Sequence, residues 1–218
     1  MSYRRDELSA ALTDVRRAYR LLWAYQRRMD DLTNTFARHL GFVDYWFEPD
    51  DKEGWARLPM VSYGRAYLRY SSGEYPRREY WNYPKPGDLM LNFWIESDSE
   101  HRRLGEQSSW KREPNPIEFR DAAESKSLVH VDIFANLIDR QEITNWRDGI
   151  LRPTYYLEHE DNRLVDHAKV PGIKIFTQTF DLVDLGDGDA IVDAADRLRK
   201  ALVAAGGTWP SDDNEPSP

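Results

Sequence analysis

The sequence predicts an α+β fold, in which a long N-terminal helix and a C-terminal helix pack on a mainly antiparallel sheet of five to six strands. Apolar residues recur at helical spacing over residues 6–40, alternate at strand spacing in several segments of 42–185, and return to helical spacing over 189–205. No helical pattern separates the alternating segments, and strands without crossover helices favour antiparallel pairing. We therefore expect one sheet with both helices on the same face.

The first helix is expected over residues 6–40, several times the average helix length of ~11–12 residues. Its apolar stripe alternates in steps of four and three residues, is widened on one flank, and comprises Leu8, Ala11, Leu12, Val15, Ala18, Tyr19, Leu22, Tyr25, Met29, Leu32, Phe36 and Leu40. Gly41 follows as the predicted stop. At ~1.5 Å per residue the helix is ~50 Å long, more than one small sheet covers, so part of it should pair with another helix.

The opposite side of this helix is basic. At about 100° per residue, a ridge falls almost opposite the stripe and consists of Arg16, Arg20, Arg27 and Arg38. This ridge is a candidate contact for phosphates or for an acidic partner. Four Arg side chains are few beside the ~6–10 phosphate contacts of strong nucleic-acid binders, so nucleic acid is the less favoured partner and a solvated helix face is the favoured interpretation.

Six segments alternate with a period of two residues and are predicted to be strands, at residues 42–47, 60–70, 88–97, 127–138, 155–159 and 172–185. Residues 71–87 form an aromatic, turn-rich loop, and residues 98–125 form a polar excursion with a short helix near 117–123. The closing helix, 189–205, has Asp187 or Asp189 as its cap. Residues 1–207 are predicted to be one domain, and 208–218 a disordered acidic tail.

Composition narrows the class of protein. The chain has 218 residues and a net charge of −8, but residues 1–40 hold eight Arg against four Asp and one Glu, so the acidic excess lies in the rest of the chain. Cysteine is absent, which excludes disulfides, thiolate zinc sites and a Cys nucleophile. The sequence shows neither a signal peptide nor a membrane-spanning apolar run, so we expect a cytoplasmic protein without membrane contact. The 23 Arg against 7 Lys suggest a prokaryotic source.

The strongest catalytic candidate is the His130-x-Asp132 pair on the predicted strand 127–138. Residues two apart on a strand project from the same face, and Glu96 joins them if the strand of residues 88–97 lies alongside. Such a cluster serves metal-dependent hydrolases and nucleases, in which a divalent cation generates hydroxide. The pattern is short and common, and a hydrogen-bonded histidine on a polar sheet face is favoured, so no metal site and no cofactor are assigned unless the hydrolase interpretation holds.

A second candidate site is aromatic. Tyr80, Trp81 and Tyr83 lie in the loop of residues 71–87, and Trp94 lies on the next predicted strand. These rings could form the pocket of a ligand-binding module, although the favoured interpretation is that the loop covers the sheet and uses its rings as core.

The sequence lacks the nucleophile elbow, the phosphate loop and the zinc-protease motif, and it holds no complete dinucleotide-binding glycine motif. The leading hypothesis is therefore a non-enzymatic interaction or assembly-subunit protein, which uses its long N-terminal helix to bind a protein partner or a second copy of itself. A metal-dependent hydrolase or nuclease and an aromatic ligand-binding module are the alternatives.

Overall fold

A computed structural model describes residues 5–47, 62–69, 84–109, 114–139, 146–151 and 161–210. Its α-helices are α1 (Arg5–His39), α2 (Ser99–Gln107) and α3 (Gly188–Ala204). Its strands are β1 (Val43–Phe47), β2 (Ser62–Arg69), β3 (Leu89–Glu96), β4 (Leu128–Asn136), β5 (Leu164–Asp166) and β6 (Ile173–Asp181). Short helical turns are η2 (Pro116–Glu118), η3 (Ala122–Glu124), η4 (Arg147–Leu151) and η6 (Leu182–Leu185).

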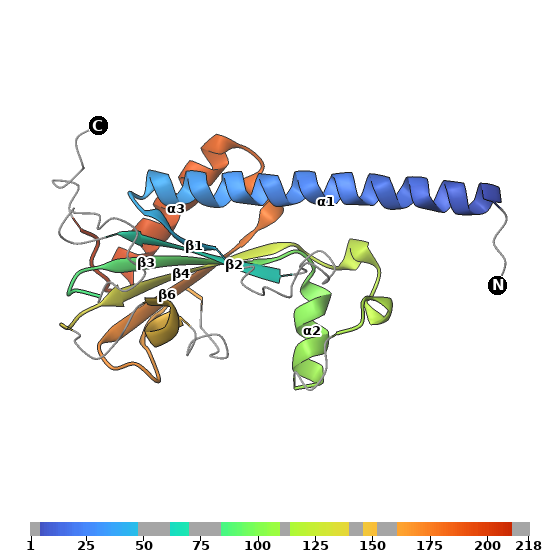
Figure 1. The fold of residues 1–218 in the computed structure, drawn as a ribbon. Coiled ribbons are helices and arrows are strands. Elements are labelled where there is room, and N and C mark those ends of the chain that lie inside the picture. The colour runs from blue at the N-terminus through green and yellow to red at the C-terminus, as the bar shows by residue number, and fades with distance from the viewer. Residues whose placement is uncertain are drawn as a thin grey trace.

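The strands form one six-stranded sheet in the order β1-β2-β3-β4-β6-β5, and every neighbouring pair is antiparallel. Figure 1 shows α1 and α3 on the same side of this sheet, with α2 beyond one end of β3. The predicted α+β class and the placement of both long helices on one face are confirmed. No helix in the described ranges combines the length and the apolar character that crossing a membrane demands.

The C-terminal part of α1 packs on the sheet from Met29 onward. The ring of Phe36 is fully buried and meets Phe93 of β3 edge-on, with 5.4 Å between ring centroids, and Phe180 of β6 at 6.0 Å. Such edge-to-face pairs add to the stabilisation from apolar burial. The helix ends where Gly41 adopts a φ of +74°, a conformation that glycine reaches without strain.

The closing helix α3 lies beside α1. Its N-cap is Asp187, whose side chain accepts a hydrogen bond from the backbone N–H of Ala190 at 2.9 Å. His39 of α1 contacts Asp196 of α3 at 3.1 Å, and this contact lowers the pKa of the Asp196 carboxyl. The two helices and the sheet face beneath them therefore form one core.

The second face of the sheet is buried as well. At one end it carries an apolar cluster in which Met90, Phe134 and Ile175 from three strands pack with Trp146 and Ile150 around η4. Further along the same strands the side chains become polar, and Glu96 and Asn92 are 2% and 4% exposed. The polar face predicted from sequence is therefore present, and its side chains at Glu96 and Asn92 are buried.

Several expectations from sequence are corrected. Within residues 98–125 the main helix is α2, not a helix near 117–123, where only the two short turns η2 and η3 occur. The last long strand ends at Asp181, four residues early, because the Asp181 carboxylate accepts a hydrogen bond from the Val183 N–H and caps η6. Trp209, within the predicted tail of residues 208–218, packs against the core beside Phe42, with 6.0 Å between ring centroids. The predicted strand at 155–159 lies outside the described residues.

Candidate functional site

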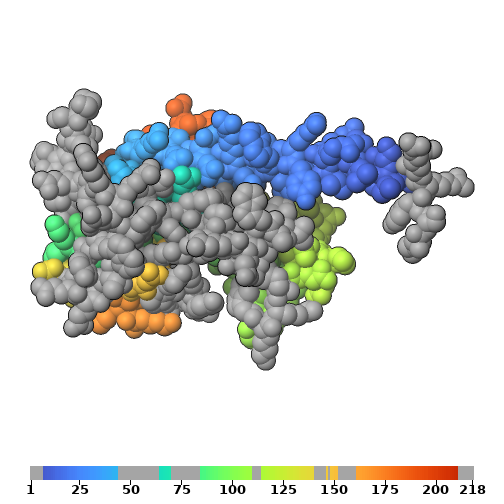
Figure 2. All heavy atoms as spheres, viewed as in Figure 1, coloured from blue at the N-terminus to red at the C-terminus, as the bar shows by residue number. Residues whose placement is uncertain are grey.

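The first half of α1 projects beyond the sheet, and we call residues 5–24 the arm. Figures 1 and 2 show these turns continuing past the body that carries the sheet. Tyr25 makes the first contact with the body, since its hydroxyl lies 3.0 Å from the Ser97 hydroxyl at the end of β3. Burial raises the pKa of Tyr25, as expected for a phenol at the point where the helix meets the sheet. Before that point most of the described side chains of the helix are exposed.

The arm exposes a line of large apolar side chains, which we call the seam: Leu8, Leu12, Val15 and Tyr19. They are 49%, 47%, 49% and 65% exposed, respectively. Their steps of four, three and four residues match the a and d positions of a heptad repeat, the pattern by which one helix packs against another. Exposed Trp23 extends the apolar surface on one flank of the seam, whereas exposed Leu21 lies on nearly the opposite side of the helix.

The predicted basic ridge is exposed along its length. Arg16, Arg20, Arg27 and Arg38 all lie at the surface. Arg16 donates a hydrogen bond to the Thr13 hydroxyl, and the Arg27 guanidinium lies 5.6 Å from the ring of Trp23. These contacts are local to α1, so the ridge is available to solvent or to a partner.

The predicted catalytic residues lie on the covered face of the sheet. His130 stands opposite Trp94 in the β3–β4 register, and its Nε2 lies 3.0 Å from Oε2 of Glu96. The same Glu96 oxygen is 3.2 Å from Nε of Arg102 on α2. The other imidazole nitrogen of His130 lies 2.9 Å from the hydroxyl of Thr179 on β6. Sequence reasoning correctly brought His130 and Glu96 together.

Asp132 belongs to a different group of contacts. Its carboxylate accepts hydrogen bonds from Asn92 at 3.2 Å and from Thr177 at 2.8 Å, and it is 8% exposed. Asp132 therefore shares a sheet face with His130, but each side chain is held by neighbours on the adjoining strands. In the described part of the chain, no three His, Cys, Asp or Glu residues are grouped so that they could hold one metal ion.

One atom of this cluster has an unused acceptor. Oε1 of Glu96 is buried and has no hydrogen-bond partner among the described residues. A buried carboxylate oxygen without a donor is costly, so a bound cation or a ligand donor would gain a contact at this position.

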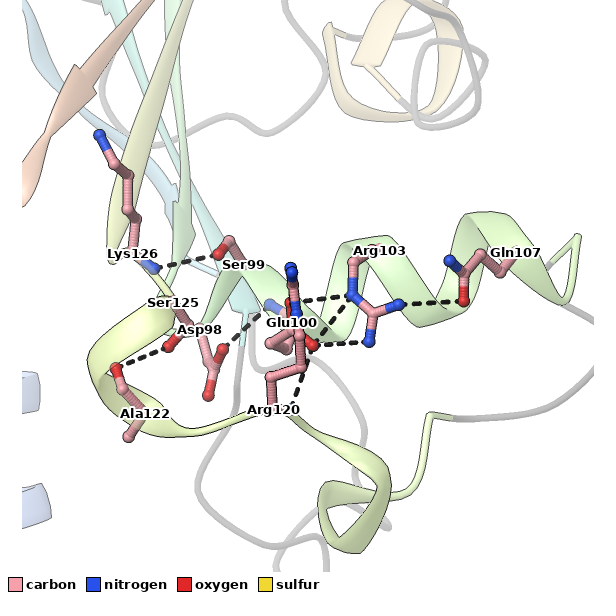
Figure 3. Close-up of polar contacts among 9 residues, drawn as sticks. All are labelled: Asp98, Ser99, Glu100, Arg103, Gln107, Arg120, Ala122, Ser125 and Lys126. Carbon is pink, nitrogen blue, oxygen red and sulfur yellow. Dashed lines mark hydrogen bonds and ion pairs between the residues drawn. The ribbon is translucent and has the colours of Figure 1, made fainter.

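Sequence reasoning missed a second buried carboxylate, Glu100, in the first turn of α2 (Figure 3). Glu100 is 1% exposed and accepts hydrogen bonds from two guanidinium groups. Arg103 reaches it from one turn further along α2, at 2.6 to 2.9 Å, and Arg120 reaches it from the segment between η2 and η3 at 2.6 and 3.0 Å. The backbone N–H of Arg120 donates a further hydrogen bond at 3.2 Å.

These donors hold the pKa of the Glu100 carboxyl well below its usual range, Arg103 having the largest effect and Arg120 the next. The arrangement joins α2 to the loop that precedes β4, and it uses both carboxylate oxygens of Glu100. We interpret it as a structural lock. An acidic residue two positions after the Asp98 cap was the signal in the sequence, because acids are favoured in the first turn of a helix.

The predicted aromatic pocket is described only in part. Tyr80, Trp81 and Tyr83 lie outside the described residues, and Trp94 is half-buried on the covered sheet face. A hollow of about 510 Å³ opens elsewhere, at the base of the arm, lined by Tyr25, Arg28, Lys126, Asp181 and their neighbours. Within it Lys126 and Asp181 pair at 3.3 Å. Arg28 donates hydrogen bonds to the carbonyls of Leu185 and Gly186, which fixes the helix at this point.

Comparison with known proteins identifies a family. A family model described as PM0109 matches residues 5–206, which is nearly the whole chain, so the chain belongs to that family. A relative from Pasteurella multocida (strain Pm70), named "Uncharacterized protein PM0109", is 28% identical over 217 aligned residues, which cover 90% of this chain and 97% of the relative. No solved structure matches. The match includes the arm as well as the sheet.

Proposed function

We propose that this member of the PM0109 family is a non-enzymatic interaction protein, a subunit of an assembly, whose contact surface is the arm. One observation carries the proposal: the seam places four large apolar side chains in solvent on a projecting helix. Contiguous exposed apolar surface of this kind marks interaction sites in soluble proteins.

The arm has no evident role in the folding of its own chain. The buried part of α1 begins at Met29, and the contacts that fix the helix to the body are made by Tyr25, Arg28 and the residues that follow. An isolated helix of this length is marginal in water, and helices in proteins owe most of their stability to packing of an apolar face. A partner surface that covers the seam would explain why about five turns of helix carry large apolar side chains without packing on the sheet.

The proposal is tested by measuring mass in solution with light scattering across a range of protein concentrations. Leu12→Asp places a charge in the middle of the seam, and we expect it to weaken association at least tenfold. Ala10→Asp is the matched control, since Ala10 is exposed on the same turn but points away from the seam. Both variants should unfold at the wild-type temperature.

Two outcomes would contradict the proposal. If wild-type protein stays monomeric throughout and Leu12→Asp changes no binding partner captured by tagged protein, the seam is not a contact surface. If both Asp variants weaken association equally, the effect is one of net charge, and the seam has no special role.

A second candidate is a divalent-cation site at Glu96, favoured by the unused Oε1 of that buried carboxylate. Such a site would fit the hydrolase alternative, because Nε2 of His130 lies 3.0 Å from the other carboxylate oxygen of Glu96. Calorimetric titration with Mn²⁺ and Mg²⁺ tests it. Binding that is lost in Glu96→Gln and kept in Asp132→Asn supports the candidate, whereas no heat of binding for the wild-type protein removes it.

A further inference from the structure

The seam lies on the side of α1 that, further along the helix, packs against the body of the same molecule. Eighteen residues make five full turns of helix, so positions 18 residues apart share one direction. Asp30, Thr33 and Ala37 therefore point the same way as Leu12, Val15 and Tyr19. Thr33 and Ala37 are fully buried, and Asp30 pairs with Arg65 of β2 at 2.8 Å.

This geometry limits how a second helix can lie on the seam. Beside the arm the flank is open, but beside residues 30–37 the flank is filled by β2, where the Tyr67 hydroxyl lies 3.0 Å from that of Thr33. A helix running parallel to α1 along the seam would continue into β2. An antiparallel helix would have its N-terminal end near β2. The body of the second chain would then lie beyond the N-terminal end of the first arm.

We propose that the seam binds the arm of a second copy of this chain, and that the two arms pair antiparallel about a two-fold axis between Thr13 and Asp14. This inference rests on the proposed function and names the partner. The axis sets Leu8 opposite Tyr19 of the partner copy and Leu12 opposite Val15 of the partner copy. Each such pair occurs twice by symmetry, so all four seam residues of both chains fill consecutive layers.

Charge along the arm supports the same orientation. Residues 1–15 hold two Arg against two Asp and one Glu, whereas residues 16–28 hold five Arg and no acid. A parallel pair would set the two strongly basic segments level with each other over their whole length. An antiparallel pair sets each basic segment level with the weakly acidic end of the other arm, which lowers the repulsion between them.

The available area indicates a modest affinity. The exposed surfaces of the four seam residues amount to on the order of 400 Å² per chain, about 800 Å² for the pair, against ~1,200–2,000 Å² for a standard interface. Flanking side chains such as Trp23 add to this figure. We therefore expect a dimer that dissociates on dilution rather than an obligate one.

Cysteine cross-linking tests the inference cleanly because the chain has no native cysteine. Chains carrying only Leu8→Cys are mixed with tagged chains carrying only Tyr19→Cys and oxidised. Helices packed ~8–10 Å apart bring facing Cα atoms within the ~4.4–6.8 Å that a disulfide needs. We expect a mixed disulfide dimer, and little cross-linking in either variant alone, since symmetry-related copies of each position are about 16 Å apart along the axis.

The matched control is a mixture of Ala10→Cys and Arg17→Cys chains. These positions are level with each other in the proposed pair but lie on the outer sides of the two helices, and they should not cross-link. Efficient self-cross-linking of Leu8→Cys alone would mean parallel pairing and overturn the inference while leaving the proposed function intact. Absence of any mixed disulfide, with self-association still abolished by Leu12→Asp, would overturn the antiparallel register in favour of another arrangement of the two copies. A chain that is monomeric and insensitive to Leu12→Asp would overturn both.

Discussion

The two halves of α1 should respond very differently to the loss of a large apolar side chain. Phe36→Ala removes a ring that is fully buried between β3 and β6. A Phe→Ala change in a packed core costs about 3–5 kcal/mol, from the lost burial and the cavity that is left. For a domain of this size each kcal/mol lowers the melting temperature by about 2–4 °C, so we expect a fall of roughly 6–20 °C.

Leu12→Ala is the comparison in the arm. Leu12 is 47% exposed and lies in the arm, so its loss should change the free energy of unfolding by no more than about 0.5 kcal/mol. The assay is chemical and thermal unfolding followed by circular dichroism at a concentration low enough to keep the chain monomeric. Equal destabilisation by the two substitutions would refute the division of α1 into a packed half and a free arm. A loss below about 1 kcal/mol for Phe36→Ala would refute the packing of α1 on the sheet.

Three further outcomes are expected. The folded state lowers the pKa of Glu100, so the stabilisation that this carboxylate provides is present above the ordinary carboxyl pKa of about 4.3 and declines as the pH falls below it. The difference in melting temperature between wild type and Glu100→Gln should therefore shrink on acidification. A difference that stays constant with pH would contradict the structural lock. Tyr67→Phe removes a buried hydroxyl that lies 3.0 Å from both the Thr33 hydroxyl and Oδ1 of Asn34, so it should cost about 1 kcal/mol in urea unfolding, and part of this cost should vanish in a Thr33→Val background; full additivity would rule out the Thr33 contact. Gly41→Ala forces an unfavourable φ and moves a Cβ into the Arg69 guanidinium, so it should destabilise by about 1–2 kcal/mol, whereas Gly188→Ala, which has open space, should be near neutral; equal effects would argue against strain at Gly41.

The parts of the fold that sequence predicted are those with a repeating apolar pattern. Strands β3 and β4 were predicted to within two residues at each end, and their apolar residues lie on the predicted faces. Helix α2 was missed because its sequence, SEHRRLGEQ, has no apolar face. It is held instead by the Asp98 cap and by Glu100, whose second partner, Arg120, is 20 residues away. A contact between residues 20 positions apart cannot be predicted from a local sequence pattern.

The candidate site on the sheet shows the same limit. Alternation alone put His130, Asp132 and Glu96 on one face. Their actual partners depend on the register between strands, which pairs Asn92 and Thr177 with Asp132 and brings Thr179 beside His130. Register depends on the packing of whole strands, so a single sequence did not predict that the His and the Asp would be held apart.

The breadth of the apolar stripe on α1 has a structural explanation. Over residues 29–40 the apolar residues point into the sheet, whereas Leu8, Leu12, Val15 and Tyr19 lie toward the flank that β2 occupies in the packed half. On a helical wheel the two sets are offset by roughly 80° and merge into one wide face. A helix with a single role would keep one narrow face along its length. The change of direction is what the proposed pairing of arms requires: one surface for the sheet of its own chain, and one, beside the arm, for a second helix in the position that β2 takes beside the body.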